Sequence, residues 1–335
     1  MARLGRQLGP GSISVLIDHA QQLQALKRFT ETTGFPADIF IKIDTGYHRA
    51  GVHTDASSFQ DIVNCISTDL EPSGNGRLRG FYSHAGHSYG GDSEEAALEL
   101  LAQEIERSAT AAMKAVGDQP RDRRLVLSIG ATPTATSVQS LLDASPTSSG
   151  NPKLQGRVQK LKKTIAEVKR TFTIELHAGV YALLDLQQLA TRAQPRKGMG
   201  DLGLSILAEV ASSYPDRDPP EMLVAAGSLS LGREPCKSYS GWGIVADWGM
   251  PLLKDHEAGH SGWIVDRVSQ EHGILRQESP QATASELRIG QKVRIWPNHA
   301  CIAGAGFDWY FVVDSSMPEH LKDVVVDVWV RWRGW

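Results

Sequence analysis

The first two hundred residues alternate short apolar runs with amphipathic stretches. Each run is followed by a turn rich in glycine and histidine and then by apolar residues at the helical spacing, which is the pattern of a βα unit. Five runs are largely apolar, as strands covered on both faces should be. They are residues 14–18, 39–44, 78–84, 125–130 and 173–177. The pattern therefore predicts five parallel strands with helices between them.

Two helices can be placed from their side chains alone. Between the second and third runs, apolar residues fall at i, i+3, i+4 and i+7, namely Phe59, Ile62, Val63 and Ile66. After the third run, Ser93 has the chemistry of a helix N-cap, and the two glutamates that follow it suit the positive end of a helix. Residues 140–152 are rich in Ser, Thr, Pro and Gly and predict a loop.

The pattern changes after residue 195 to short strand candidates separated by turns. These candidates are residues 206–210, 222–226, 243–246, 262–268, 293–296, 309–313 and 324–332. The sequence therefore predicts an α/β domain over residues 1–195 and an all-β domain over residues 196–335.

Composition narrows the class of protein. The 335 residues are 41% hydrophobic and 22% charged, with a formal charge of −3 and no basic stripe, so neither nucleic acid nor an anionic membrane is an expected partner. Three cysteines lie far apart in sequence, which argues against a disulfide framework. No apolar run is long enough to span a bilayer, and residues 1–11 lack the apolar core of a secretory signal. We expect a cytoplasmic protein.

His299 and Cys301 are the first candidate ligands. They stand two residues apart in what the pattern predicts to be a strand, where alternate side chains project to the same face. An imidazole and a thiolate on one face could bind one soft cation, and zinc suits that donor pair. On spacing alone, a packed histidine beside a small buried cysteine is the better interpretation.

Four segments carry a resemblance to a known family. Residues 41–52, Ile-Lys-Ile-Asp-Thr-Gly-Tyr-His-Arg-Ala-Gly-Val, resemble a barrel-strand signature of the alanine-racemase-type enzymes, which use pyridoxal phosphate. Residues 80–89, 269–273 and 297–301 narrow the resemblance to the eukaryotic D-serine dehydratases, with the D-threonine aldolases as near relatives. The similarity runs through both domains. It implies a (β/α)8 barrel joined to a β domain that carries the metal ligands.

The resemblance also implies a deficit. Five strand runs are present where a (β/α)8 barrel has eight, and the first run resembles the family's fourth strand. At roughly 30 residues per βα unit, about 90 residues are then expected ahead of Met1. In the family, the first strand supplies the lysine that forms the Schiff base with the cofactor, and nothing in residues 1–14 matches it. Lys42 lies on a different strand and is not taken as its substitute. The missing lysine puts the activity of this chain on its own in doubt, because that residue both holds the cofactor and removes the Cα proton.

The resemblance assigns the cofactor contacts. In barrel enzymes the loops after the last two strands commonly bind phosphate through backbone N–H groups. Gly179 and Val180 are the expected phosphate contacts, and Tyr181 is expected beside the cofactor or substrate. Thr132 and Thr134 are expected to add hydroxyl donors, although hydroxyls in such a turn are also ordinary turn formers.

Three residues are expected to act on the substrate. Arg49 lies just beyond a strand end, where a guanidinium could bind the phenolic oxygen of the cofactor or a substrate carboxylate, unless it is simply an exposed loop arginine. His84 is expected to face substrate or cofactor rather than to bind metal with His87, and Tyr89 joins it from the same motif. For His177 a structural, hydrogen-bonded role is at least as good an interpretation.

The implied reaction is β-elimination from a D-amino acid that carries a β-hydroxyl. D-serine would yield pyruvate and ammonia, with pyridoxal phosphate accepting the electron pair and zinc assisting the departure of hydroxide. A thiolate at position 301 favours zinc over harder metals, and it favours a dehydratase over an aldolase. The alternatives are a non-catalytic homologue that acts through a partner, and a D-threonine aldolase or amino-acid racemase. A homodimer is carried over from the resemblance alone.

Overall fold

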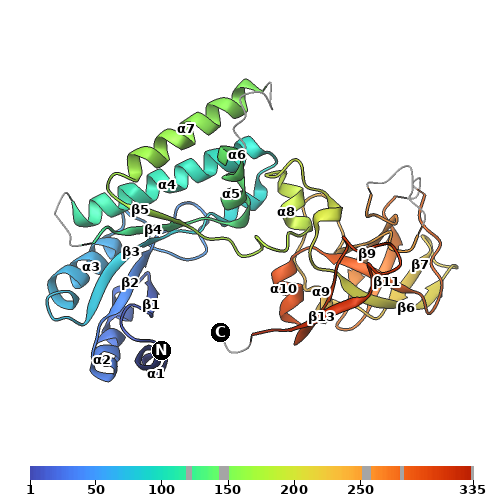
Figure 1. The fold of residues 1–335 in the computed structure, drawn as a ribbon, viewed down its shortest axis with the longest axis horizontal. Helices are drawn as coiled ribbons and strands as arrows, with labels where there is room; N and C mark the ends of the chain where they lie inside the picture. The colour runs from blue at the N-terminus through green and yellow to red at the C-terminus, as the bar shows by residue number, and fades with distance from the viewer. Residues whose placement is uncertain (118–122, 143–150, 251–257, 280–282, 333–335) are drawn as a thin grey trace. The chain divides into compact units, whose positions relative to one another are not determined.

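The computed structural model describes residues 1–117, 123–142, 151–250, 258–279 and 283–332 (Figure 1). The chain forms two compact units. The first consists of Met1–Gly179 with Thr191–Pro195, and the second of Val180–Ala190 with Arg196–Trp335. Most of the loop predicted at 140–152 lies outside the described residues.

The first unit is built on five parallel strands, as the sequence predicted. They run in the order β1-β2-β3-β4-β5, with the bounds Ser14–Ile17, Ala37–Lys42, Gly76–Tyr82, Val126–Ile129 and Thr173–Leu176. The helices are α1 (Ala2–Leu8), α2 (Gln24–Thr33), α3 (Ser57–Cys65), α4 (Glu94–Val116), α5 (Thr132–Ser137), α6 (Gln139–Leu142) and α7 (Pro152–Val168). Short helical turns are η1 (Ala20–Leu23), η2 (Ile66–Leu70) and η3 (Gly86–Gly90).

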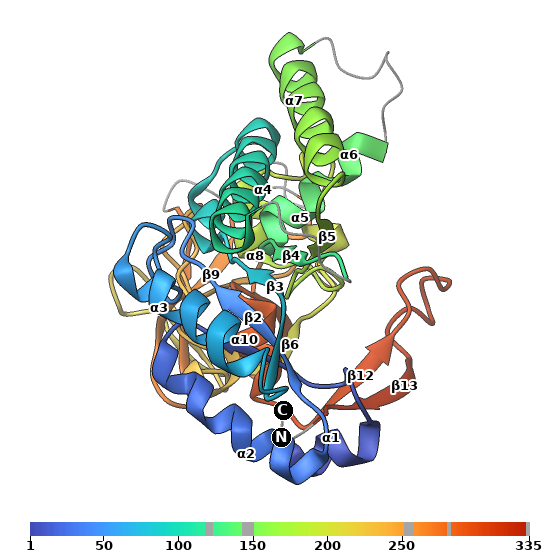
Figure 2. The same ribbon diagram turned by 90° about the vertical axis from the view of Figure 1, so that its left-hand side faces the viewer.

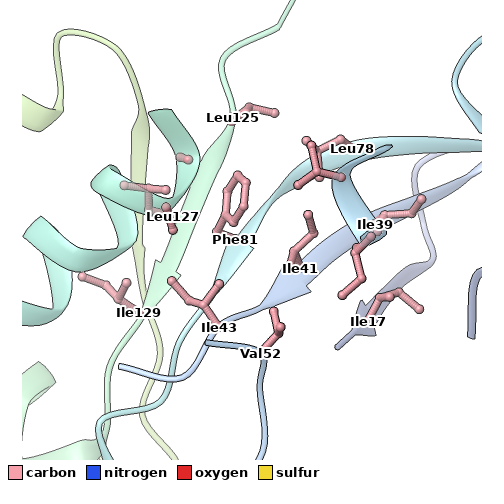
Figure 3. Packing of buried hydrophobic residues seen from close by; sticks show 14 of the residues in the cluster. Ile17, Ile39, Ile41, Ile43, Val52, Leu78, Phe81, Leu125, Leu127 and Ile129 are labelled. Atoms are coloured by element: carbon pink, nitrogen blue, oxygen red, sulfur yellow. The ribbon is translucent and has the colours of Figure 1, made fainter. Parts of the chain in front are cut away.

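One face of this sheet carries the hydrophobic core. Strand side chains alternate between faces, and one set from β2, β3 and β4 is fully buried together with apolar residues of α2, α3, α4 and α7. Figure 3 shows this set, in which Ile41, Phe81 and Leu127 have no exposed surface. The helices α4 and α7 lie side by side in both ribbon views (Figures 1 and 2). The alternate side chains of the same strands are therefore left to the other face.

The longest helix, α4, begins as its sequence predicted. Ser93 is the N-cap, and its hydroxyl oxygen accepts a hydrogen bond from the Ala96 N–H at 3.3 Å. Glu94 and Glu95 lie in the first turn, where the positive end of the helix dipole favours carboxylates. The buried face of α4 is apolar except for Ser108 and one charged residue, Glu104, which is 2% exposed.

At Gly80 the backbone of β3 leaves no room for a side chain beside β4. A Cβ at this position would lie 1.9 Å from the Val126 carbonyl oxygen. Only glycine leaves room for the neighbouring backbone at such a distance. Two residues further along the same pair, Tyr82 lies opposite Ser128.

The second unit contains a closed antiparallel barrel in the order β10-β7-β6-β11-β8-β9. Its strands are β6 (Ile206–Tyr214), β7 (Glu221–Val224), β8 (Gly243–Val245), β9 (Trp263–Val268), β10 (Gly273–Gln277) and β11 (Lys292–Pro297). A separate ribbon pairs β12 (Trp309–Val313) with β13 (Val325–Val330). Short helices are α8 (Leu186–Thr191), η4 (Met199–Asp201), α9 (Ser228–Leu231) and α10 (Ala300–Ala305). The predicted all-β character is confirmed, although the sequence pattern missed β10.

The expectation of a strand across residues 299–301 is wrong. Strand β11 ends at Pro297, which has no N–H to continue the ladder, and helix α10 begins at Ala300 with His299 as its N-cap. The Ala-Cys-Ile-Ala-Gly-Ala segment favours a helix because alanine has the highest helix propensity. The argument that His299 and Cys301 share one strand face therefore fails.

The described part of the chain contains no helix that combines the length and the apolar character needed to cross a membrane.

Candidate active site

A row of polar residues crosses the sheet face opposite the helices of the first unit. Lys42 on β2 lies opposite Tyr82 on β3, which lies opposite Ser128 on β4, which in turn lies opposite Glu175 on β5. Except for Glu175 on β5, these residues stand next to buried apolar neighbours that face the helices, so strand alternation directs them to the other side. The row lies near the carboxyl ends of the strands, where parallel α/β enzymes carry their sites.

Aromatic rings are stacked on this row. The Tyr82 and His177 rings lie parallel, with centroids 4.4 Å apart and an interplanar angle of 6°. The His84 ring lies 6.2 Å from His177 at an angle of 19°. The Lys42 ammonium lies 4.6 Å from the centre of the Tyr82 ring. Burial, then the nearby Arg49 guanidinium, lowers the pKa of Lys42.

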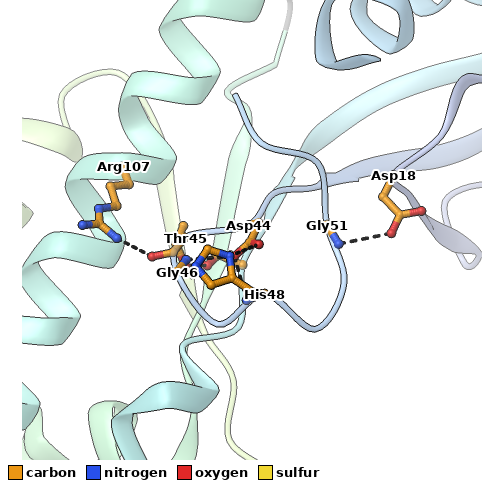
Figure 4. Close-up of polar contacts among 8 residues, drawn as sticks. Asp18, Asp44, Thr45, Gly46, His48, Gly51 and Arg107 are labelled. Carbon is orange, nitrogen blue, oxygen red and sulfur yellow. Dashed lines mark hydrogen bonds and ion pairs between the residues drawn. The ribbon is translucent and has the colours of Figure 1, made fainter. Parts of the chain in front are cut away.

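The loop after β2 is shaped by the Asp-Thr-Gly sequence (Figure 4). One oxygen of Asp44, Oδ1, accepts hydrogen bonds from the Gly46 N–H at 2.8 Å and the His48 N–H at 3.1 Å. Its other oxygen lies 2.8 Å from His48 Nδ1. An aspartate that bonds its own following backbone is a turn former. Gly51 lies so close to the end of β2 that a Cβ there would be 2.7 Å from the Ile43 carbonyl carbon. The motif thus folds back on the end of β2.

Arg49, from the same loop, and His84, just after β3, both contact one ring. The Arg49 guanidinium carbon lies 5.0 Å from the centre of the Tyr47 ring, and the His84 ring meets Tyr47 edge to face at 5.8 Å. Gly86 permits this contact, since a Cβ there would lie 2.4 Å from a Tyr47 ring carbon. Two residues expected to act on substrate are therefore brought together, by a tyrosine that the sequence interpretation had not singled out.

His84 is held in one protonation state. Its Nδ1 lies 3.0 Å from the Gly130 carbonyl oxygen, which can only accept a hydrogen bond, so Nδ1 carries the proton. Burial, and then the Arg49 charge, lowers the pKa of His84. A neutral ring with its proton on Nδ1 leaves Nε2 with a free lone pair.

His177 is also held neutral. The Ser128 hydroxyl donates to Glu175 Oε1 at 2.7 Å, so its oxygen can accept from His177 Nδ1 at 3.2 Å. Burial, together with the neighbouring His84, lowers the pKa of His177 to about 4. Its Nε2 is buried without a hydrogen-bond partner in the described residues. A buried acceptor without a partner is costly, and such atoms are often completed by a ligand.

The expected phosphate contacts divide between the two units. Thr134 is fully buried, and its hydroxyl accepts from the Ala131 N–H at 3.0 Å and donates to the Ala131 carbonyl at 3.1 Å. This hydroxyl is thus used in the turn. Thr132 is buried at the start of α5, and Gly179 is exposed at the end of the first unit. Val180, which is buried, and Tyr181, which is exposed, group with the second unit. Tyr89 is half-buried in η3.

In the second unit, Asp185 anchors the start of helix α10. Its Oδ2 accepts from the Ala300 N–H at 3.0 Å, and its Oδ1 accepts from the Gln188 N–H at 2.9 Å. Burial, followed by the Asp185 carboxylate, raises the pKa of the exposed Cys301 thiol. The His299 ring interacts with the same carboxylate, and its Nδ1 is buried without a hydrogen-bond partner in the described residues. Both candidate ligands thus lie within reach of the Asp185 charge.

Asn298 fixes the backbone immediately before this pair. Its amide nitrogen donates to the carbonyls of Glu234 and Gly241, both at 2.9 Å. Its amide oxygen accepts from the Tyr239 hydroxyl. A buried amide with three hydrogen bonds holds the junction between β11 and α10 rigidly. Within the described ranges, no three or more His, Cys, Asp or Glu side chains form a cluster that could hold a metal ion.

Comparisons with known proteins agree with this architecture. Residues 5–145 match the family described as "Alanine racemase, N-terminal domain", and residues 203–313 match the "Putative serine dehydratase domain". The crystal structure of D-threo-3-hydroxyaspartate dehydratase from Delftia sp. HT23 is similar over 100% of this chain and 76% of that protein, with a TM-score of 0.68 and 27% identity. The fold therefore defines an alanine-racemase-like enzyme with a C-terminal β domain.

Curated relatives narrow this class. D-serine dehydratase of Schizosaccharomyces pombe is 38% identical over 96% of this chain and 68% of its own length. D-serine dehydratase of Saccharomyces cerevisiae is 33% identical over 100% of this chain and 71% of its own length. The chain belongs to the D-serine dehydratase family.

Proposed function

We propose that this protein carries the site of a D-serine ammonia-lyase that depends on pyridoxal phosphate and zinc, and that releases pyruvate and ammonia. The observation that carries the proposal is the placement of Arg49 and His84 against one Tyr47 ring, in a chain related to fungal D-serine dehydratases. A guanidinium can bind a carboxylate through two parallel hydrogen bonds. A neutral imidazole beside it can accept a proton or a hydrogen bond from the same small substrate.

In this proposal each residue has a defined task. Arg49 binds the substrate carboxylate or the phenolic oxygen of the cofactor, and its charge adds to burial in lowering the pKa values of His84 and Lys42. His84 presents the unprotonated Nε2, because the Gly130 carbonyl fixes the proton on Nδ1. Tyr89, from the turn that follows His84, completes the side facing the substrate.

The residues of the first unit fit pyridoxal phosphate. The unpartnered Nε2 of His177, on a ring stacked flat against Tyr82, offers one acceptor to a planar ligand. Within this unit, Gly179 and the Thr132 turn are the proposed phosphate contacts, whereas the Thr134 hydroxyl is used within its own turn. When bound, the cofactor supplies an electron sink for the bond that breaks at Cα.

The residues of the second unit fit zinc in donor type. His299 offers an unpartnered ring nitrogen and Cys301 an exposed thiol, and imidazole with thiolate is a donor pair that zinc accepts. Fewer than four protein ligands leave a position open for substrate, as in a catalytic rather than a structural metal site. When bound, zinc would stabilise the negative charge on the departing hydroxyl oxygen. Asn298 and Asp185 would hold the backbone that carries the two ligands.

The lysine that forms the Schiff base in the family is the one component for which we find no matching segment among the 335 residues. Lys42 has a lowered pKa, but it lies on β2 and over the Tyr82 ring, whereas the family places its lysine on another strand. We therefore propose that turnover requires a lysine-bearing segment in addition to these residues. The competing proposal is a non-catalytic homologue that acts through a partner.

The test compares the 335-residue chain with the same chain preceded by a segment that carries the family's Schiff-base lysine motif. Both are supplied with pyridoxal phosphate and zinc, and pyruvate released from D-serine is measured. We expect visible absorbance of lysine-bound cofactor and pyruvate release only from the longer protein. Pyruvate from the 335 residues alone would overturn the lysine requirement. Absence of pyruvate from both, with cofactor bound, would favour the non-catalytic reading.

The same assay separates the enzymatic alternatives. An aldolase would release an aldehyde from D-threonine, and a racemase would form L-serine without pyruvate. We expect pyruvate from D-serine to dominate and to be lost on treatment with a chelator. Turnover that survives removal of the metal would eliminate zinc from the mechanism.

A cytosolic location and a homodimer remain part of the proposal. Cys65, Cys236 and Cys301 are all free thiols, which suits a reducing compartment. Sedimentation of the protein at several concentrations tests the dimer.

A further inference from the structure

Glu104 is a buried carboxyl on the side of the sheet that the helices cover. The proposed reaction does not use it. It projects from the apolar face of α4 and is 2% exposed. The Ser83 hydroxyl donates to Glu104 Oε1 at 2.8 Å. Since the Ser83 proton is used there, the Thr45 hydroxyl donates to Ser83 Oγ at 2.6 Å. The chain of hydroxyls therefore joins α4 to the strand-end segments after β2 and β3.

The carboxyl also faces two backbone N–H groups. Its Oε2 lacks a partner of full hydrogen-bond geometry in the described residues, yet the N–H groups of Gly130 and Ala85 lie close enough to lower its pKa. Burial outweighs them and raises the pKa of Glu104 to about 7. A carboxyl in this state is neither firmly charged nor firmly neutral near physiological pH.

Glu104 contacts residues next to His84 but does not contact His84 itself. Ser83 and Ala85 are the sequence neighbours of His84, and Gly130 provides the carbonyl that fixes its ring. Arg107, one turn after Glu104 on α4, donates to the Thr45 carbonyl (Figure 4). One helix thus holds the ends of β2, β3 and β4 in register with each other.

We propose that Glu104 is a positioning residue, which sets the orientation and the tautomer of His84 by holding Ser83, Ala85 and Gly130. The proposal rests on the proposed function only for the task of His84. Its structural content stands on the contacts themselves, and it is tested without substrate, cofactor or metal.

We expect the ionisation of Glu104 to change the position and the tautomer of the His84 ring through these contacts. A carboxylate attracts the N–H groups of Ala85 and Gly130 strongly, whereas a protonated carboxyl attracts them less. The other groups that face it are the Ser83 hydroxyl on the β3 side and the Tyr82 phenol, whose pKa is raised by burial and then by the Glu104 charge. On α4 itself, Ser108 and Arg107 lie one turn further along.

The experiment is nitrogen NMR of labelled histidine rings in the 335-residue protein, titrated from about pH 5 to about pH 9. The His84 signals are assigned by their loss in His84→Gln. We expect the Nδ1–H form of His84 to exceed the Nε2–H form by about ten-fold, which is opposite to the preference of free histidine. We also expect a second inflection near pH 7 in the His84 shifts, from Glu104.

Glu104→Gln keeps the size of the side chain and removes the ionisation. It should abolish the inflection near pH 7 and reduce the tautomer excess several-fold. Glu106→Gln is the matched control, because Glu106 lies on the same helix and accepts from the Thr164 hydroxyl at 3.0 Å instead. The control should titrate like the unaltered protein. A residue with a merely structural role would lower stability and leave the His84 tautomer unchanged.

Two results would overturn the proposal. One is the absence of an inflection near pH 7 in the His84 signals of the unaltered protein. The other is an unchanged tautomer and titration in Glu104→Gln. A failure of the dehydratase assay would not touch either result, so the two proposals fail separately.

Discussion

The buried Glu104 carboxyl makes the stability of the first unit depend on pH. Its pKa rises from an ordinary value of 4.5 to about 7 on folding, chiefly because burial disfavours the charged form. The folded state therefore binds the proton more tightly than the unfolded state. The stabilisation from this proton is fully present below pH 4.5 and is lost as pH rises through 7. At about 1.4 kcal/mol per pKa unit, the loss amounts to about 3 kcal/mol.

The assay is urea unfolding of the protein and of Glu104→Gln at several pH values, followed by helical circular dichroism. Tryptophan fluorescence is unsuitable, because all eight tryptophans follow residue 241 and none lies in the Met1–Gly179 part of the first unit. We expect the unfolding free energy of the protein, relative to Glu104→Gln, to fall by about 3 kcal/mol between about pH 4.5 and about pH 8. The difference cancels other titrating groups, including His177. A difference between the protein and Glu104→Gln that stays flat across this range would refute the reasoning.

Three further results are expected. Gly130→Ala should destabilise the first unit by about 1–3 kcal/mol in urea, because residue 130 has φ +134° and a Cβ would lie 2.5 Å from the His177 carbonyl oxygen; an unchanged midpoint contradicts this. His299→Ala and Cys301→Ala should each abolish stoichiometric zinc, measured by elemental analysis after dialysis, and full retention in both would remove the pair as ligands. Asn298→Ala leaves both ligands in place and should weaken zinc binding by about ten-fold in a competition titration, since it frees the β11–α10 junction; equal affinity would show that this junction does not orient them.

The central parallel sheet was predictable because its strands are short, largely apolar runs. A run such as Ile39 to Ile43, with one lysine among apolar residues, favours a strand, and the turn residues after it mark the strand end. Ser93 was predictable as a cap for the same local reason. Strand β10 was missed because its five residues include one glycine, one arginine and one glutamine. Its place is set by pairing with β7 and β9.

Candidate site residues could be proposed from the sequence only where a motif marked them. Arg49 and His84 stand in recognisable segments, and the structure adds the Tyr47 ring that joins them. The expected strand at His299 failed because the helix start depends on Asp185, which is more than a hundred residues away in sequence. Glu104 gave no signal, since a glutamate in a long charged helix is ordinarily exposed. Its burial is a property of the tertiary fold.

The lack of room for a side chain at Gly80, where β3 pairs with β4, affects how natural variants of this protein should be interpreted. A side chain at position 80 would meet the Val126 carbonyl and push the two strands apart, and the strand pair that carries Tyr82 and Ser128 would separate with them. Such a variant would damage the enzyme although every group that handles substrate stayed intact. A screen that scores only chemically reactive positions would pass it as harmless.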